Sequence, residues 1–218
     1  MAILRYGLAG MLSGKLGNVV VYHVLGKEVV RMKGRISKAP TEKQLANRQR
    51  LSVITKFLVK MKPFIEVGFG PAARAARVYP MNEVVKWNKS VALKGVYPDF
   101  QVDFEKVLLS KGDLPGLEGV SIVLEGNVLR FSWLVPGGLM WPRSWDQVML
   151  LAFFPDVVAD GSEFWQAYFV LSGARRKQGF DVLEIPAALV SERIEVYVAV
   201  VSDDRGEVST SQYLGRLN

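Results

Sequence analysis

The stretch RIEVYVAVV, Arg193 to Val201, alternates residue by residue between two kinds of side chain. An extended strand sends successive side chains to opposite faces, so one face here is wholly apolar: Ile194, Val196, Val198 and Val200. The other face carries Arg193, Glu195 and Tyr197. The pattern predicts a β-strand with one face turned into a hydrophobic core and the other turned away from it.

Further strand-like runs surround this stretch on both sides. They are rich in β-branched and aromatic residues and are separated by turn residues: Val120–Glu125, Val128–Trp133, Gln147–Phe154, Phe164–Leu171, Phe180–Ile185 and Glu207–Leu214. The run Gln147–Phe154 is apolar on both faces, which predicts a central strand. Short strands at this spacing are typical of an antiparallel sandwich.

The first half of the chain combines a hairpin pattern with apolar residues at helical spacing. Residues 17–33 predict a β-hairpin, with its turn at Gly26-Lys27. Thr41 and Gln44 fit a capping box that starts a helix. A helical stripe of apolar residues follows at spacings of three and four: Leu51, Ile54, Leu58, Met61 and Ile65. A second helix is predicted from Met81 to about Leu93, because Pro80 suits its first turn and Gly95 its end.

These patterns predict an α+β protein in which an N-terminal hairpin and helices pack against a C-terminal antiparallel β-sandwich of the immunoglobulin or fibronectin III kind. Residues 1–112 hold 20 basic and 7 acidic side chains, and residues 113–218 hold 8 and 14. We therefore expect two parts, a basic hairpin-and-helix segment over 1–112 and a sandwich domain over 113–218. Their opposite charges favour mutual attraction.

Several classes of function are excluded or disfavoured by composition. The chain has no cysteine, which rules out thiol nucleophiles, disulfides and cysteine-ligated metals. His23 is the only histidine, lies in a strand-like run and is expected to be half-buried and structural. Arg5 is followed by a short apolar run that Gly7 and Gly10 interrupt, so no convincing export signal is expected. Without a run long enough for a membrane span, the default expectation is a cytoplasmic protein.

An ordered set of segments carries a resemblance to a known family. These segments are SGKLGNVVVYHVLGKEVVR, PTEKQLANRQRLSVITKFL, PFIEVGF, NEVVKWN, GVYPDF and LLSKGDL, followed more loosely by FSW, DQVMLLAFFP, SGARR and EVYVAVVSDDRGEVSTSQYLG. Together they resemble an uncharacterised family of Bacteroidetes proteins of about this length. That family implies no activity and no site residues. The C-terminal part is similar to fibronectin III and immunoglobulin-like domains, with Trp133 placed like their core tryptophan.

The basic segment from Lys27 to Lys62 holds 11 basic and 2 acidic residues. Such a surface suits nucleic acid, whose phosphates release counterions on binding. The charge is spread over hairpin, loop and helix, however, and few aromatic residues are available to stack on bases. We therefore favour a solvated helix face, with Lys43, Arg50 and Lys60 contacting a partner protein, and keep nucleic acid binding as the alternative.

The loop VPGGLMWPRSW is the second candidate, with Leu139, Met140, Trp141 and Trp145 among prolines and glycines. It departs from the related family, in which this stretch is small and polar. An exposed tryptophan cluster would be a contact surface. The favoured reading is that both rings are buried, because large aromatic side chains mostly are. The cations of SGARRK, Ser172 to Lys177, are expected to be solvated.

The sequence favours a non-enzymatic structural or protein-interaction module, in a surface or phage-like assembly, with a protein partner or self-association. Its expected contact surfaces are the Leu139–Trp145 loop and the basic helix face of Lys43, Arg50 and Lys60. No cofactor, metal or small-molecule substrate is indicated. A hydrolase using carboxylates such as Asp99 and Asp103 is the least favoured class, because no pairing singles out an acid and a base. Asp103 and Glu105 are expected on the wet face of a strand.

Overall fold

The computed structural model describes residues 2–4, 12–35, 37–159 and 162–218. Arg5, Gly7 and Gly10, on which the export-signal argument depends, lie outside these residues. The chain divides into two compact units, Met1–Leu45 and Ala46–Asn218. The predicted boundary between residues 112 and 113 rested on the change of charge and of side-chain period. The division into compact units falls earlier, between Leu45 and Ala46, because the helices share a core with the C-terminal strands.

The first unit contains an antiparallel sheet in the order β1 (Ala2–Leu4), β2 (Leu12–Leu16), β3 (Val19–Val24) and β4 (Lys27–Met32). The β3–β4 hairpin confirms the prediction for residues 17–33. Its two-residue turn is Leu25-Gly26, one residue earlier than predicted, and both residues have positive φ. Such a turn matches the twist of the two strands. His23 is exposed on β3, so its expected half-burial is wrong.

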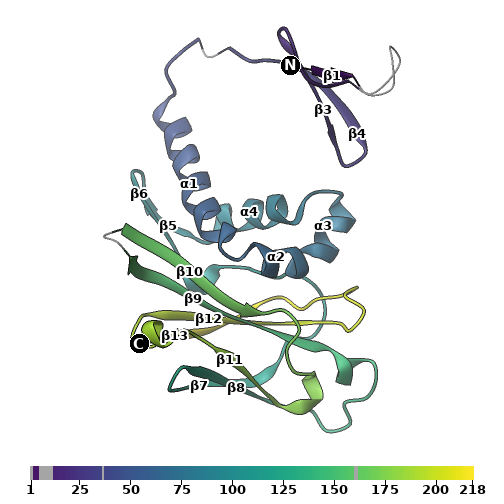
Figure 1. Cartoon of the computed structure of the whole chain (residues 1–218), viewed down its shortest axis with the longest axis vertical. Helices are drawn as coiled ribbons and strands as arrows, with labels where there is room; N and C mark the ends of the chain where they lie inside the picture. The colour runs from purple at the N-terminus through teal and green to yellow at the C-terminus, as the bar shows by residue number, and fades with distance from the viewer. Residues whose placement is uncertain (1, 5–11, 36, 160–161) are drawn as a thin grey trace. The chain divides into compact units, whose positions relative to one another are not determined.

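The second unit contains two antiparallel sheets that pack face to face (Figure 1). The larger has the order β10 (Ser162–Val170), β9 (Gln147–Ala159), β12 (Ile194–Val201) and β13 (Gln212–Leu217). The smaller has the order β11 (Phe180–Glu184), β8 (Val128–Leu134) and β7 (Glu118–Glu125). The protein is thus α+β, and the predicted β-rich C-terminal part is confirmed.

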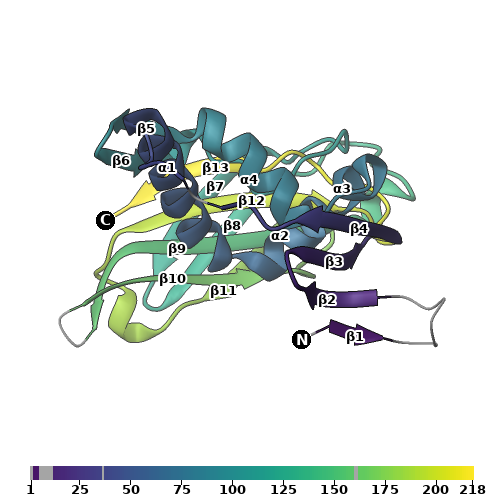
Figure 2. The same cartoon turned by 90° about the horizontal axis from the view of Figure 1, so that it is seen from above.

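Helices cover the other face of the four-stranded sheet, as Figure 2 shows from above. They are α1 (Glu42–Val59), α2 (Lys62–Gly68), α3 (Gly70–Ala76) and α4 (Pro80–Val91). Strand β12 is consequently buried along its whole length. Its predicted apolar face packs on the smaller sheet, and Tyr197, Ala199 and Val201 on its other face pack against the helices. The four-stranded sheet is therefore the middle layer of three.

Helix α1 starts as predicted, with a reciprocal capping box. The Thr41 amide donates to the Gln44 side chain at 3.0 Å, and the Gln44 amide donates to the Thr41 hydroxyl at 3.4 Å. Farther along, Ile54, Leu58 and the following Met61 and Ile65 are fully buried, as the apolar stripe predicts. Leu51 belongs to the same stripe and is 46% exposed. The apolar stripe of α1 thus extends beyond the surface that covers it.

An aromatic cluster joins the helical layer to the middle sheet. The ring of Phe57 in α1 meets that of Phe153 in β9 edge to face, with centroids 4.8 Å apart. Phe104, in the short 3₁₀ turn η1 (Phe104–Lys106), and Trp165 in β10 surround the same ring at 5.8 and 6.1 Å. Edge-to-face contacts at this spacing are favourable beyond the area they bury. The cluster fixes the position of α1 on the sheet.

The connection between the helices and the smaller sheet is also anchored. A short hairpin, β5 (Leu93–Val96) and β6 (Asp99–Val102), follows α4. The buried side chain of Asn88 in α4 then donates to the Leu108 carbonyl and accepts from the Leu108 amide, both at 2.8 Å. A buried amide side chain is stable only when such partners satisfy it. This clamp holds the connecting segment against the helices.

Candidate interaction surfaces

A groove of ≈ 820 Å³ runs along α1 within the second unit. Seven of its lining residues come from α1 or the residue after it, at spacings that keep them on one helix face, and one comes from β10. They are Arg48, Leu51, Ser52, Thr55, Lys56, Val59, Lys60 and Trp165. Because the opposite face of α1 packs on the sheet, the groove is the outer side of a helix that is anchored below.

Apolar side chains form part of this groove without being covered. Leu51 is 46% exposed and Val59 is 51% exposed. Trp165 is half-buried, with its ring held edge-on by Phe57 and Phe153. Exposed apolar residues that gather beside an aromatic ring, unlike scattered ones, are typical of contact surfaces.

The charges along the groove have one sign. Arg48, Lys56 and Lys60 line it, and no acidic residue does among the side chains that the structure describes. Leaving aside residues 158–164, whose side chains the structure does not describe, none of these three cations has a carboxylate within 4.0 Å. The groove therefore combines apolar contact area with three cationic side chains.

The three cations that were predicted to form one basic helix face lie at three different places in the structure. Lys60 lines the groove. Arg50 instead places its guanidinium 4.7 Å from the centre of the Phe100 ring, on the β5–β6 hairpin. Lys43 is exposed and belongs to the first unit. Leu51, Val59 and Trp165 were not selected from the sequence, because their apolar side chains read there as core residues.

The loop after β8 presents the second candidate surface. Met140 and Trp141 are 77% and 78% exposed, so the expected burial is wrong for Trp141. Leu139 is half-buried. Trp145 is 37% exposed, and the guanidinium of Arg175 lies 3.5 Å from its ring centre, with the Lys177 ammonium at 5.1 Å. These two cations thus stack on the Trp145 ring, whereas Met140 and Trp141 extend outward.

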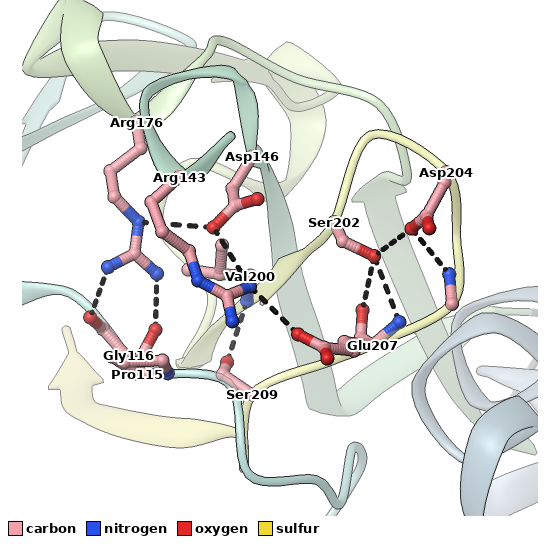
Figure 3. A network of polar contacts seen from close by, with 11 residues as sticks. Pro115, Gly116, Arg143, Asp146, Arg176, Val200, Ser202, Asp204, Glu207 and Ser209 are labelled. Atoms are coloured by element: carbon pink, nitrogen blue, oxygen red, sulfur yellow. Dashed lines mark hydrogen bonds and ion pairs between the residues drawn. The ribbon is translucent and has the colours of Figure 1, made fainter. Parts of the chain in front are cut away.

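A buried ion pair supports this loop (Figure 3). Arg176, expected to be solvated, is buried and donates to the carbonyls of Pro115 and Gly116. Its Nε lies 3.9 Å from Oδ2 of buried Asp146, and neither atom has a hydrogen-bond partner among the described residues. Arg143 lies between Asp146, at 3.9 Å, and Glu207, at 2.8 Å. The network joins the loop to the segment that enters the smaller sheet.

Burial shifts both members of this pair away from their charged forms. Desolvation raises the pKa of Asp146 above its usual 3.8, although Arg176 and Arg143 act in the opposite direction. Desolvation likewise lowers the pKa of Arg176, and Asp146 opposes that shift. Burial of a charge is costly when its hydrogen bonds are incomplete, so the arginine is the main compensation for the carboxylate. This cluster is a structural support.

The carboxylates considered for a hydrolase do not form a site. Asp103 binds Lys106 in an ion pair at 2.8 Å, and Asp99 is an exposed residue at the start of β6. Within the described ranges, no group of three histidine, cysteine, aspartate or glutamate side chains could hold a metal ion. The helices described here include none that is long and apolar enough to cross a membrane.

Replacing Trp141 with alanine should change the free energy of unfolding by less than about 0.5 kcal/mol, as is usual for an exposed side chain. Replacing Trp145 with alanine should cost about 1 kcal/mol, because it removes the ring on which Arg175 and Lys177 stack. Urea denaturation of both variants measures the difference. A loss of more than about 2 kcal/mol for the Trp141 variant would place that ring in the core.

Comparison with known proteins identifies the class of the chain. A family model described as a family of unknown function, DUF6266, matches residues 11–215. The chain therefore belongs to the DUF6266 family, in agreement with the resemblance to an uncharacterised family. No curated protein matches the chain.

Proposed function

We propose that this protein is a non-enzymatic protein-interaction module that binds a partner protein in the groove along α1. The observation that carries the proposal is the exposed side of α1, where apolar residues and three cations line one groove. A helix anchored on one side and apolar on part of the other is a suitable docking surface. A surface or phage-like assembly is the setting that we expect for such a module.

The strand arrangement supports a more specific fold for the scaffold. Seven strands divide into sheets of three and four, and the fourth strand in chain order, β10, lies beside the third, β9. In constant-type immunoglobulin domains the fourth strand joins the other sheet. We therefore infer that the sandwich is of the fibronectin III kind, with buried Trp133 donating its indole N–H to the Arg176 carbonyl at 2.8 Å. Rigid sandwiches of this class commonly carry binding surfaces at their periphery.

The proposal can be tested by cross-linking from inside the groove. A photoreactive benzoylphenylalanine is placed at Ser52, which lines the groove, and in a control at the exposed Lys94 of β5. The proteins are irradiated in the cells that naturally make them, and the adducts are identified by mass spectrometry. We expect one defined protein adduct from position 52 that is absent from position 94.

The second variant in this experiment carries Leu51→Asp, which puts a charge among the apolar groove residues and should abolish the adduct from position 52. Circular dichroism and urea denaturation of the same variant check that it is folded. Adducts that are equal at both positions, or that contain nucleic acid in place of protein, would contradict the proposed function.

A further inference from the structure

The groove residues on α1 fall into two parallel rows. Residues four apart form ridges on a helix surface. One ridge consists of Leu51, Thr55 and Val59, and the next consists of Arg48, Ser52, Lys56 and Lys60. The first ridge is apolar apart from one hydroxyl, and the second carries all the positive charge of the groove. At a rise of about 1.5 Å per residue, the two rows extend along about 18 Å of helix.

Two ridges of this kind suit another helix better than an extended peptide. A partner helix can lay its own four-residue ridge between them, whereas an added strand needs the free backbone groups of a sheet edge. Seven of the eight lining residues belong to α1 and its end, and their side chains form the surface. Apolar residues of the partner would contact Leu51 and Val59, while residues on one flank would meet Lys56 and Lys60.

The cations of the groove indicate which charge the flank of the partner helix should carry. Lys56 and Lys60 are exposed, and no carboxylate lies within 4.0 Å of either among the side chains that the structure describes, which leave out residues 158–164. Opposite charges across an interface raise specificity and association rate. We propose that the groove binds an amphipathic helix with an acidic flank from a different protein; this rests on the proposed function and names the partner's chemistry.

Other occupants fit the groove less well. A second copy of this chain offers no acidic helix, because each of α1, α2, α3 and α4 carries at least as many basic as acidic residues. Residues 1–45 hold 8 basic and 2 acidic residues, so like charge opposes their binding. Nucleic acid would need exposed ring faces for stacking, and Trp165, the ring among the described side chains that lines the groove, is held by Phe57 and Phe153.

The test uses the full chain and two designed helical peptides with a fluorescent label. Both carry leucine along one helix face; the flanks are glutamate in the first peptide and lysine in the second. Fluorescence anisotropy measures binding at low and moderate salt. We expect the glutamate peptide to bind at least tenfold more tightly than the lysine peptide, with a difference that decreases as salt screens the charges.

A charge reversal then locates the binding. The double variant Lys56→Glu with Lys60→Glu should lower the affinity for the glutamate peptide at least tenfold and raise the affinity for the lysine peptide. Lys86→Glu with Lys94→Glu, an equal change of net charge outside the groove, should leave both affinities within about twofold, because distant exposed charges are screened. The affinity for a labelled thymidine oligonucleotide is measured in the same way. Light scattering measures whether each variant forms a dimer.

Three results would overturn the inference. The first is equal binding of both peptides, and the second is tighter binding of the oligonucleotide than of the glutamate peptide. The third is a dimer that the reversal at Lys56 and Lys60 disrupts. If the lysine peptide binds and Leu51→Asp abolishes that binding, only the predicted charge is wrong and the protein-interaction function stands. If neither peptide binds and position 52 yields no specific protein adduct, the proposed function fails as well.

Discussion

Replacing Phe57 with alanine should lower the free energy of unfolding by about 3–5 kcal/mol, the usual cost of emptying a large aromatic site in a core. The ring is fully buried and contacts Phe104, Phe153 and Trp165 from three different elements. Its loss leaves a cavity that cannot close without moving α1 away from the four-stranded sheet. Urea denaturation with an unchanged m-value measures the difference.

The matched control for this prediction is Val59→Ala on the same helix. Val59 is 51% exposed, so its truncation should stay within about 0.5 kcal/mol of the parent protein. Phe57→Leu should fall between the two, because it fills part of the site. If Phe57→Ala cost less than about 1 kcal/mol, the helical layer could not share a core with the sheet as described.

Replacing Arg176 with methionine should cost about 3–5 kcal/mol at neutral pH, the range for removing one member of a buried ion pair. The substitution leaves the Asp146 carboxylate buried without its compensating charge and frees the carbonyls of Pro115 and Gly116. A surface comparison is Arg130→Met, which removes an exposed ion pair with Glu125. That variant should lose no more than about 1 kcal/mol.

The cost of Arg176→Met should also depend on pH in a defined direction. Burial already raises the pKa of Asp146 above 3.8, and removal of the arginine raises it further. The folded variant then binds a proton that the unfolded chain does not, so its stability increases as pH falls toward 3.8. The destabilisation should therefore be largest at neutral pH and smaller in acid.

The double variant Arg176→Met with Asp146→Asn provides the control for this mechanism. It should be about 1–3 kcal/mol more stable at neutral pH than Arg176→Met alone, because no unpaired charge stays buried. The difference between the two variants should disappear in acid, where Asp146 is protonated. A cost for Arg176→Met that is the same at every pH would show that the lost hydrogen bonds, and not the charge, account for it.

Several parts of the fold could be predicted because their cause is local. The alternation in Ile194–Val201 places one face of that strand in a core wherever the strand lies. The pairing of Thr41 with Gln44 depends only on residues three apart, and it forms as predicted. Apolar side chains on both faces of the run from Gln147 correctly indicated a central strand.

Other parts depended on contacts between distant segments. Leu51 and Ile54 belong to one helical stripe, yet only Ile54 is covered, because Leu51 lies on the side of α1 that lines the groove. Arg176 sits in a run of cations that reads as solvated, but its guanidinium binds carbonyls 60 and 61 residues earlier in the chain. Glu195 was placed on the polar face of its strand and is buried, with its carboxylate accepting hydrogen bonds from Arg193 and Tyr213.

The sequence by itself indicated the β3–β4 hairpin, helices α1 and α4 and the strands of the two packed sheets, since side-chain period and capping act over a few residues. It also determined which chemistries the chain lacks, because no cysteine is present and His23 stands alone. Only the tertiary structure decided which apolar residues stay uncovered, and so where the groove along α1 lies. Exposure depends on which surfaces the chain brings against one another, and residue spacing along the sequence does not specify that.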